Sequence, residues 1–545
     1  MKPGMAVPKS TRSVARERIQ RQRSRRTLGL ILVACILATA ICVFIFNPVF
    51  APDKTDPSKT FSSAQVLPSS TETPSITQVA EVKTPTDIPK VDPTVMATLP
   101  TQAQIVTYPK DVPILYYSQS GDSLAILAVH FGVEMNEITS TNPIPDEGFI
   151  PPGELLLIPS RLEEISSPLK LFPDAEVVNS PSTVDFDIEA FIIEAGGYLS
   201  TYQEYLASSG WTSGADIIAK VSREYSINPR LLLALLDYQS DWVYGQPRNL
   251  EDQDFAMGYV GYDRKGLFNQ CAWAAGKISD GYYGWREGRV VALSYPDDTV
   301  LRMAPDLNSG TVGLMNLFSS LYNLPEWAGL LYGSESFIAF YETMFGNPWI
   351  RAQAYESLFT SQIVQPEMIL PFEVGKTWAL TGGPHAAWGV ADVWAALDFA
   401  PPSDAGGCLE SPEWVVASAS GLVVRSENGA VVIDLDGDGF EQTGWNIVYM
   451  HIATKQRIPL GSRVESGDRI GHPSCEGGRS TGTHVHIARK YNGEWVPADG
   501  PLPFLLSGWI ARAGSVIYTG WLIKDDKIVR ASVASTYISQ ITREE

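Results

Sequence analysis

The sequence predicts a multidomain α+β protein whose helical and strand segments lie in separate parts of the chain. At 545 residues, the chain is longer than one hydrophobic core usually organises. Helical patterns dominate residues 184–371, whereas residues 372–505 alternate like the strands of a mainly antiparallel sheet. A hydrophobic fraction of 44% with 19% charged residues is enough to form cores and excludes a wholly disordered chain.

The charge of the chain is strongly asymmetric. It carries 41 Lys+Arg against 61 Asp+Glu, a net charge of −20, which argues against a nucleic-acid-binding protein. Residues 1–27 hold nine basic groups and one acid, Glu17, so this segment is +8 and the remainder is −28. We interpret residues 1–27 as a basic cytoplasmic head.

An uncharged apolar run follows the basic head and predicts a single transmembrane helix over residues 28–50. The run from Leu28 to Phe46 contains no charge, and about 20 apolar residues cross a bilayer as a helix. Because positive charge stays in the cytoplasm, we expect a single-pass protein of the cell membrane with its C-terminal domains extracytoplasmic. A cleaved signal peptide would need a shorter apolar run and small residues at its exit.

Residues 51–110 are rich in Pro, Thr, Ser and Val and show neither a helical nor a strand period. Such a composition is typical of an extended linker. We expect it to hold the outer domains away from the membrane.

Residues 111–160 predict a small βααβ module. Strands are expected near 114–117 and 154–159, and an apolar helical face follows a turn at Gly121–Ser123. A second short helix is expected over 136–140. The members of the apolar face are Leu124, Leu127, Ala128 and Phe131.

This module resembles the lysin motif, LysM, in four segments that occur in the right order. The segments are Ser118–Ser123, His130–Val133, Thr141–Pro143 and Pro152–Glu154. The resemblance implies binding to glycans that contain N-acetylglucosamine, including peptidoglycan. We interpret His130 as a structural residue.

Residues 184–371 predict a helical domain, with Ser226–Trp242 as a buried helix that has Pro229 in its first turn. This helix resembles the active-site helix of lysozyme-like lytic transglycosylases, which ends in a Glu-Ser pair. Here the pair is Gln239-Ser240, and an amide cannot protonate the leaving oxygen of a glycan. Asp237 lies on another face of the helix. We therefore expect a degenerate glycan-binding or structural domain, with an active glycosidase as the alternative.

Five of the six histidines lie between residues 385 and 486. On a strand, His484 and His486 project to one side while Val485 and Ile487 enter the core. Asp398 is an acid within an apolar strand, where an unpaired charge is costly. Two imidazoles, one carboxylate and a water molecule form a catalytic zinc site. Asp392, within a predicted loop, is the alternative carboxylate.

The same region resembles the lysostaphin/LytM-type zinc metallopeptidases, which cut peptidoglycan cross-links. The matching segments are Pro384-His385, Leu397–Phe399, Tyr449–His451 and Gly482–His486. Asp398 follows His385 by 13 positions, a spacing that resembles the staphylolysin branch. The resemblance implies that His385, Asp398 and His486 ligate Zn²⁺, that His484 assists proton transfer from water, and that His451 stabilises the oxyanion.

Three further features lie in the C-terminal part of the sequence. Whether Cys408 and Cys475 form a disulfide or stay apart is left open, because one sequence does not give the distance between the two residues. Residues 434–439 begin like a calcium loop, but Trp445 stands where the closing Glu belongs, so an acidic hairpin turn is expected. Residues 506–545 predict a β extension that covers an edge of the peptidase sheet.

The sequence therefore predicts a membrane-anchored extracytoplasmic zinc endopeptidase that hydrolyses peptide cross-links of bacterial peptidoglycan and is targeted by a LysM module. The alternative is a catalytically inactive cell-wall scaffold or hydrolase activator. Loss of one of the five zinc-site positions would favour the alternative, and none is lost.

Overall fold

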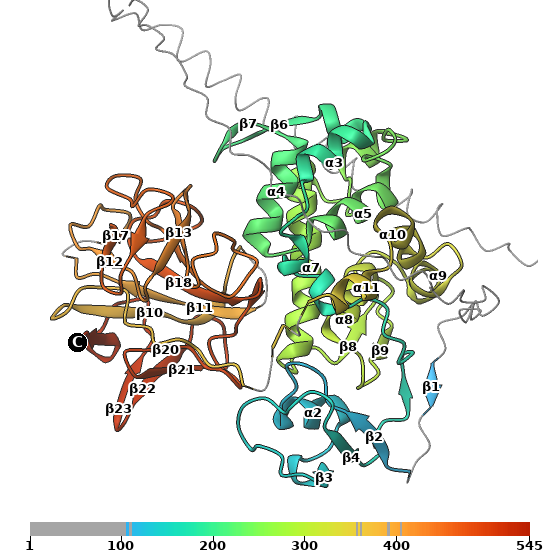
Figure 1. Ribbon diagram of the computed structural model, residues 1–545, viewed down its shortest axis with the longest axis horizontal. Coiled ribbons are helices and arrows are strands. Elements are labelled where there is room, and N and C mark those ends of the chain that lie inside the picture. The colour runs from blue at the N-terminus through green and yellow to red at the C-terminus, as the bar shows by residue number, and fades with distance from the viewer. Residues whose placement is uncertain are drawn as a thin grey trace, which may run out of the picture. The chain divides into compact units, whose positions relative to one another are not determined.

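The computed structural model describes residues 105–107, 112–355, 358–359, 362–389, 393–403 and 406–544. The predicted basic head, transmembrane helix and most of the linker lie outside these residues. Among the described helices, none is both long and apolar enough to cross a membrane. The described chain combines a helical region with a largely antiparallel β region towards the C-terminus (Figure 1).

The first module contains a three-stranded antiparallel sheet and one α-helix. Its strands are β2 (Ile114–Tyr117), β3 (Thr139–Ser140) and β4 (Leu155–Ile158), in the order β2-β4-β3, and its helix is α2 (Leu124–Phe131). The predicted second helix over 136–140 is instead one 3-10 turn, η1 (Met135–Glu137), followed by β3. The backbone becomes extended at Ile138, whose buried side chain joins the core of the module, so a longer helix would turn it away.

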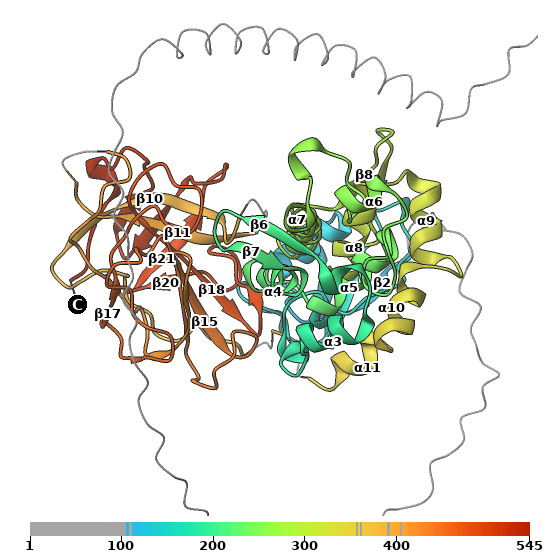
Figure 2. The ribbon, with the colours of Figure 1, turned by 90° about the horizontal axis from the view of Figure 1, so that it is seen from above.

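The middle region is mainly helical, as the sequence predicts. The longest helix, α7 (Leu267–Arg286), packs against α4 (Gly214–Tyr225) and α8 (Ser309–Ser319) (Figures 1 and 2). The other helices are α3 (Ile188–Ala195), α5 (Pro229–Ser240), α6 (Leu250–Asp254), α9 (Leu324–Tyr332), α10 (Phe337–Phe345) and α11 (Pro348–Gln353). Two hairpins accompany them, β6 (Gln203–Leu206) with β7 (Gly210–Ser213) and β8 (Ala292–Ser294) with β9 (Val300–Arg302).

Helix α5 is the buried helix expected over 226–242. The Asn228 side chain accepts a hydrogen bond from the amide of Arg230, and Pro229 occupies the first turn, where its missing N–H is no loss. Every residue from Leu231 to Leu236 is buried. A helix that is apolar on all sides is stable only inside a core, which is where α5 lies.

The C-terminal region is built on a nine-stranded antiparallel sheet, counted over its described residues. Its order is β16-β13-β14-β15-β18-β11-β10-β24, with β19 paired to β18. The strands are β10 (Thr377–Ala386), β11 (Trp394–Ala400), β13 (Gly421–Glu427), β14 (Ala430–Asp434), β15 (Trp445–Met450), β16 (Arg463–Val464), β18 (Val485–Tyr491), β19 (Glu494–Trp495) and β24 (Gln540–Thr542).

Two smaller sheets accompany the large one. A four-stranded sheet joins β20 (Leu505–Leu506), β21 (Trp509–Ala513), β22 (Gly520–Lys524) and β23 (Lys527–Arg530), and β12 (Val415–Val416) pairs with β17 (Arg469–Gly471). Strands β12 and β13 follow one another closely in the chain but belong to different sheets, because β12 pairs with β17 and β13 pairs with β14. Strand β24 pairs with β10 at the sheet edge, the position expected for part of the 506–545 extension.

The register of the central strands brings the predicted ligands together. Asp398 on β11 lies opposite His486 on β18, and His385 on β10 lies opposite Ala396. His486 also lies opposite Met450, the residue before His451. Segments 88 residues apart in the chain, as for Asp398 and His486, thus meet on adjacent strands.

Candidate metal centre

Three predicted ligands converge on one point in the C-terminal sheet. His385 Nε2 lies 3.0 Å from His486 Nδ1 and 3.2 Å from Asp398 Oδ1, and His486 Nδ1 lies 3.3 Å from the same Oδ1. All three residues are buried, with exposed fractions of 2%, 6% and 7% for His385, His486 and Asp398. These atoms also form a potential metal-binding group on geometric grounds.

The outer hydrogen bond of each imidazole determines which nitrogen faces the centre as an acceptor. His385 Nδ1 lies 2.8 Å from the carbonyl oxygen of Gly383, and His486 Nε2 lies 3.0 Å from that of Ala387. A carbonyl only accepts hydrogen bonds, so these outer nitrogens carry the protons of the neutral rings. The inner nitrogens therefore offer lone pairs, as does Asp398 Oδ1, which is buried without a hydrogen-bond partner.

Three lone-pair donors with no proton between them repel each other unless a cation lies among them. Zinc binds nitrogen and oxygen at about 2.0–2.2 Å in a tetrahedron, so its ligand atoms are about 3.3 Å apart. The separations of 3.0–3.3 Å match that edge length. The residues present therefore fit Zn²⁺, with three protein ligands and a fourth vertex for water or substrate.

The electrostatics of the centre favour the charged state of Asp398. Burial by itself raises the pKa of this carboxyl, but the imidazoles of His385, His486 and His484 close to it outweigh burial and hold the pKa well below its ordinary range. Burial likewise lowers the pKa of His385, but the Asp398 carboxylate more than offsets this effect and raises it. A bound cation takes the place of the proton that this pair attracts.

Two further imidazoles lie beside the ligands. His484 Nε2 is 3.5 Å from Asp398 Oδ1, and the rings of His451 and His484 are 4.5 Å apart between centroids. His451 Nδ1 lies 2.8 Å from the Glu476 carbonyl oxygen, and His484 Nδ1 lies 2.8 Å from that of Gly482. In both neutral rings Nε2 is consequently the free acceptor.

The environment keeps His451 neutral. Burial, followed by the nearby His484 and His486, lowers the pKa of His451 to about 3. A neutral ring that donates Nδ1–H to Glu476 has no proton left at Nε2. His451 can therefore donate a hydrogen bond to an oxyanion only after it has taken up a second proton.

The sequence did not identify three residues that shape the centre. A Cβ at Gly382 would lie 2.5 Å from Asp398 Oδ2, so only glycine fits opposite the carboxylate. The ring of Tyr518, between β21 and β22, stacks on His385 at 4.3 Å between centroids. Glu476 holds His451 through a main-chain carbonyl. The Gly382-Gly383 pair shortly before His385 was a sequence signal for Gly382. The contact of the Glu476 main-chain carbonyl has no sequence signal, because any residue carries this carbonyl.

The alternative carboxylate and the remaining His and Asp residues of this region do not join the three ligands in the part of the chain that the structure describes. Asp392, the alternative carboxylate, lies outside the described residues. His472 bonds the Glu413 carbonyl and Gln456 rather than the three ligands. Asp434, Asp436 and Asp438 cluster in the turn after β14, where the Asp434 carboxylate accepts amide N–H groups of that turn. This arrangement is the expected acidic hairpin turn.

Gln239 and Asp237, the two residues of α5 considered for glycan chemistry, make separate contacts. Gln239 Oε1 accepts a hydrogen bond of 2.8 Å from the Tyr322 hydroxyl. Asp237 points away from this contact, because its carboxylate accepts the amides of Val243 and Tyr244. Neither residue supplies a carboxylic acid to a glycan at the Gln239 position.

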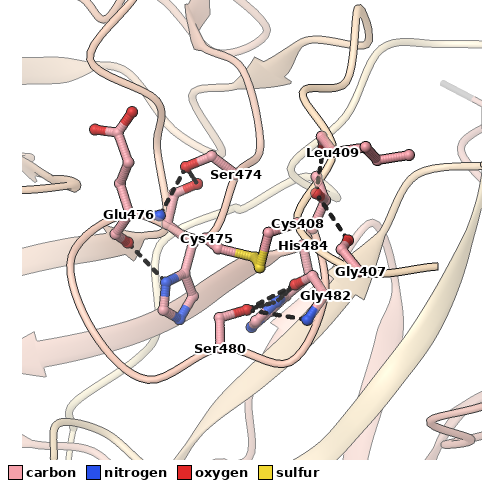
Figure 3. The surroundings of a disulfide bond; sticks show 11 residues. Gly407, Cys408, Leu409, Ser474, Cys475, Glu476, Ser480, Gly482 and His484 are labelled. Atoms are coloured by element: carbon pink, nitrogen blue, oxygen red, sulfur yellow. Dashed lines mark hydrogen bonds between the residues drawn. A yellow bond between two sulfur atoms is a disulfide. The ribbon is translucent and has the colours of Figure 1, made fainter. Parts of the chain in front are cut away.

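The structure resolves the alternatives for the two C-terminal cysteines. Cys408 and Cys475 form a disulfide that bridges the segment before β12 to the segment before β18 (Figure 3). The described chain contains one further cysteine, Cys271, which is free and buried.

Comparison with known families gives one match in the middle region. A family model described as the N-terminal domain of LasA matches residues 170–360. This stretch covers most of the region that resembles lysozyme-like lytic transglycosylases, and that resemblance stays a prediction.

Curated relatives that match part of the chain are proteases. Protease LasA of Pseudomonas aeruginosa is 24% identical over 338 residues, a match that covers 58% of this chain and 72% of LasA. The beta-lytic metalloendopeptidase of Achromobacter lyticus is 31% identical over 163 residues, covering 28% of this chain and 40% of the relative. Among solved structures, the M23 metalloprotease pseudoalterin has 23% identity and a TM-score of 0.26, covering 31% of this chain and 96% of pseudoalterin. By its similarity to protease LasA and the beta-lytic metalloendopeptidase the chain is a metalloendopeptidase, which confirms the predicted enzyme class.

Proposed function

We propose that this metalloendopeptidase is a zinc enzyme that hydrolyses the peptide cross-links of bacterial peptidoglycan. The observation that supports zinc is the convergence of His385 Nε2, Asp398 Oδ1 and His486 Nδ1, each with a free lone pair, at tetrahedral separations. The resemblance of the histidine motifs to lysostaphin/LytM-type peptidases supports the substrate.

The chain's own residues suit amide hydrolysis. Bound Zn²⁺ would polarise the attacking water and the scissile carbonyl. His484 Nε2 is positioned to accept the proton of that water, because Nδ1 is occupied by Gly482 and Nε2 faces Asp398. His451 accepts a hydrogen bond while it is neutral, and donates one to the oxyanion once it is protonated.

The location of the enzyme is a second part of the proposal. The uncharged run from Leu28 to Phe46 behind a basic head supports a single-pass anchor, with the peptidase outside the cell membrane. The LysM-like segments of residues 111–160 support binding to GlcNAc-containing glycan. Tethering and glycan binding would both raise the concentration of enzyme near its substrate.

Digestion of purified peptidoglycan tests the activity. The full-length chain in detergent is incubated with peptidoglycan, new peptide termini are identified by mass spectrometry, and bound metal is measured by atomic spectroscopy. We expect new termini with one zinc ion per chain, and no product from His484→Ala with its zinc retained. A wild-type chain without product or metal would overturn the proposal in favour of the inactive scaffold or hydrolase activator.

Flotation with lipid vesicles tests the anchor. The full-length chain should float with the vesicles, whereas a chain that starts at residue 51 should stay in the dense fraction. Equal behaviour of the two chains would overturn the anchor but leave the peptidase proposal intact.

A further inference from the structure

The segment Ser474–Glu476 holds His451 at both ends of the residue. The Ser474 amide and hydroxyl donate to the His451 carbonyl oxygen at 2.7 and 2.9 Å. His451 Nδ1 donates to the Glu476 carbonyl at 2.8 Å. The backbone of His451 is left-handed, with φ of 64°, a conformation that non-glycine residues adopt only when their surroundings impose it.

The Glu476 side chain closes the same loop from the other side. Its carboxylate accepts hydrogen bonds from the Thr454 amide at 2.9 Å and from the Thr454 hydroxyl at 2.6 Å. Glu476 thus contacts both the His451 ring and Thr454, which lies three residues after His451 in the chain. The position of Glu476 therefore determines the orientation of the His451 imidazole.

The segment around Cys408 supports His484 in a similar way. The Thr483 amide donates to the Gly407 carbonyl at 3.1 Å, and the Thr483 hydroxyl donates to the Leu409 carbonyl. His484 is the next residue, and its Nδ1 donates to Gly482. Residues 406–410 are all exposed and form neither helix nor strand.

The Cys408–Cys475 disulfide joins these two supports covalently. Cys475 lies between Ser474 and Glu476, which hold His451, and Cys408 lies between Gly407 and Leu409, which hold Thr483. The metal ligands are held differently, because the carbonyls that orient His385 and His486 belong to Gly383 and Ala387. The disulfide therefore acts on the two non-ligand imidazoles and not on the zinc ligands.

We propose that the Cys408–Cys475 disulfide is a positioning element that keeps His451 and His484 aimed at the reacting group. The proposal rests on the proposed peptidase function. Cys408 is exposed, so a reductant in solution can reach the bond. A phosphine that reduces it takes up the oxygen of one water molecule to become the phosphine oxide, and the two sulfurs become thiols.

Kinetics of the full-length zinc-loaded chain before and after phosphine reduction test the proposal. Misplaced catalytic groups lower turnover by about tenfold to a hundredfold, so we expect that loss in kcat with KM and zinc content unchanged. The Cys408→Ser/Cys475→Ser chain should show the same low kcat without reductant and no response to it. Hydrogen exchange should also quicken at the Ser474 amide after reduction.

A matched pair of variants keeps the disulfide and removes one of its supports. Thr483→Val loses the hydrogen bond to Leu409 and should lower kcat with zinc retained, whereas Thr483→Ser keeps the hydroxyl and should retain kcat. Unchanged kcat after reduction, or loss of zinc in parallel with kcat, would overturn the positioning role while leaving the peptidase function intact. A wild-type chain that is inactive before reduction would overturn both.

Discussion

At the scale of single residues, Asp398 shows how a buried charge is made tolerable. The carboxylate lies within the apolar strand β11 and faces two imidazole nitrogens at 3.2 and 3.3 Å. A charge buried in this way persists only when it is paired or binds a metal. The buried charge of Asp398 is therefore costly for the fold, and it is the charge that the metal centre needs.

Replacing Asp398 tests its part in metal binding. Asp398→Asn keeps the shape but removes the charge, so we expect zinc to be lost on purification. Product formation should fall by about a hundredfold or more, because a catalytic metal contributes several kcal/mol to the rate. His472→Gln, which leaves the ligands untouched, is the matched control and should keep both zinc and activity. Retention of zinc by Asp398→Asn, measured by atomic spectroscopy, would contradict the assignment.

His130 predicts a specific pH dependence of stability. It stacks on Trp285 at 3.7 Å between ring centroids, and burial lowers its pKa from 6.5 to about 3. The folded chain thus favours the neutral ring, and this contribution to stability is fully present above about pH 6.5. It is lost as the pH falls from 6.5 towards 3, because the unfolded chain binds a proton that the folded chain excludes.

The comparison with His130→Phe isolates this contribution. Between pH 6 and pH 4, the free energy of unfolding of the wild type should fall relative to that of the variant by about 1.4 kcal/mol per pH unit. Urea unfolding followed by tryptophan fluorescence at a series of pH values measures the difference. Parallel pH profiles for the two chains would show that His130 does not exclude a proton on folding.

At the scale of elements, the β13–β14 hairpin supports the centre through its turn. Asn428 and Gly429 both have positive φ, 46° and 75°, as a tight two-residue hairpin turn requires. A Cβ at Gly429 would lie 2.5 Å from the main-chain carbon of Glu476. The turn therefore packs directly on the segment that holds His451.

Gly429→Ala should disturb both stability and turnover. We expect overpacking to cost about 1–3 kcal/mol in the free energy of unfolding, and kcat to fall because Glu476 is displaced. Gly461→Ala is the control, because Gly461 has φ of 79° but nothing within 4 Å of an added Cβ. The control should lose stability through backbone strain and keep its kcat. Equal kcat values for the two variants would contradict a link between the turn and His451.

At the scale of the whole molecule, Arg286 at the end of α7 connects distant parts of the chain. Its guanidinium pairs with Glu494 at 2.8 Å and with Asp174 at 3.1 Å, and it donates to the Ser120 carbonyl at 2.5 Å. Burial raises the pKa of Glu494 to about 7, although Arg286 opposes that shift. One cation thus stabilises two acids contributed by different regions.

Removing this cation should weaken the contacts between the regions. Arg286→Met leaves Glu494 buried without its partner, which we expect to cost about 3–5 kcal/mol in the free energy of unfolding. Urea unfolding and limited proteolysis measure the loss. Arg248→Met removes a largely exposed cation and should cost less than about 1 kcal/mol. Similar losses for both variants would mean that burial of Arg286 has no special role.

The candidate site was predictable where the evidence was local. Alternation along a strand predicts that His484 and His486 share one side, and an acid in the apolar run 396–400 identifies Asp398. The prediction of a second helix over 136–140 was wrong. The helical turn ends at Glu137, because the buried Ile138 requires an extended backbone. The conformation of such a short segment depends on the strands packed beside it rather than on the spacing of its own apolar residues.

The sequence by itself determined the residue types of the centre, the separate helical and strand regions, and the enzyme class that the relatives confirm. The residue types and the two regions follow from periodicity and composition over a few neighbouring residues, and the enzyme class follows from the resemblance of the histidine motifs to a known peptidase family. Only the tertiary structure decided that His385 and His486 meet across 101 residues, which nitrogen each ring presents, and that Cys408 bonds Cys475. These outcomes depend on the order and register of strands in the sheet, and that order brings together segments that have no contact along the chain.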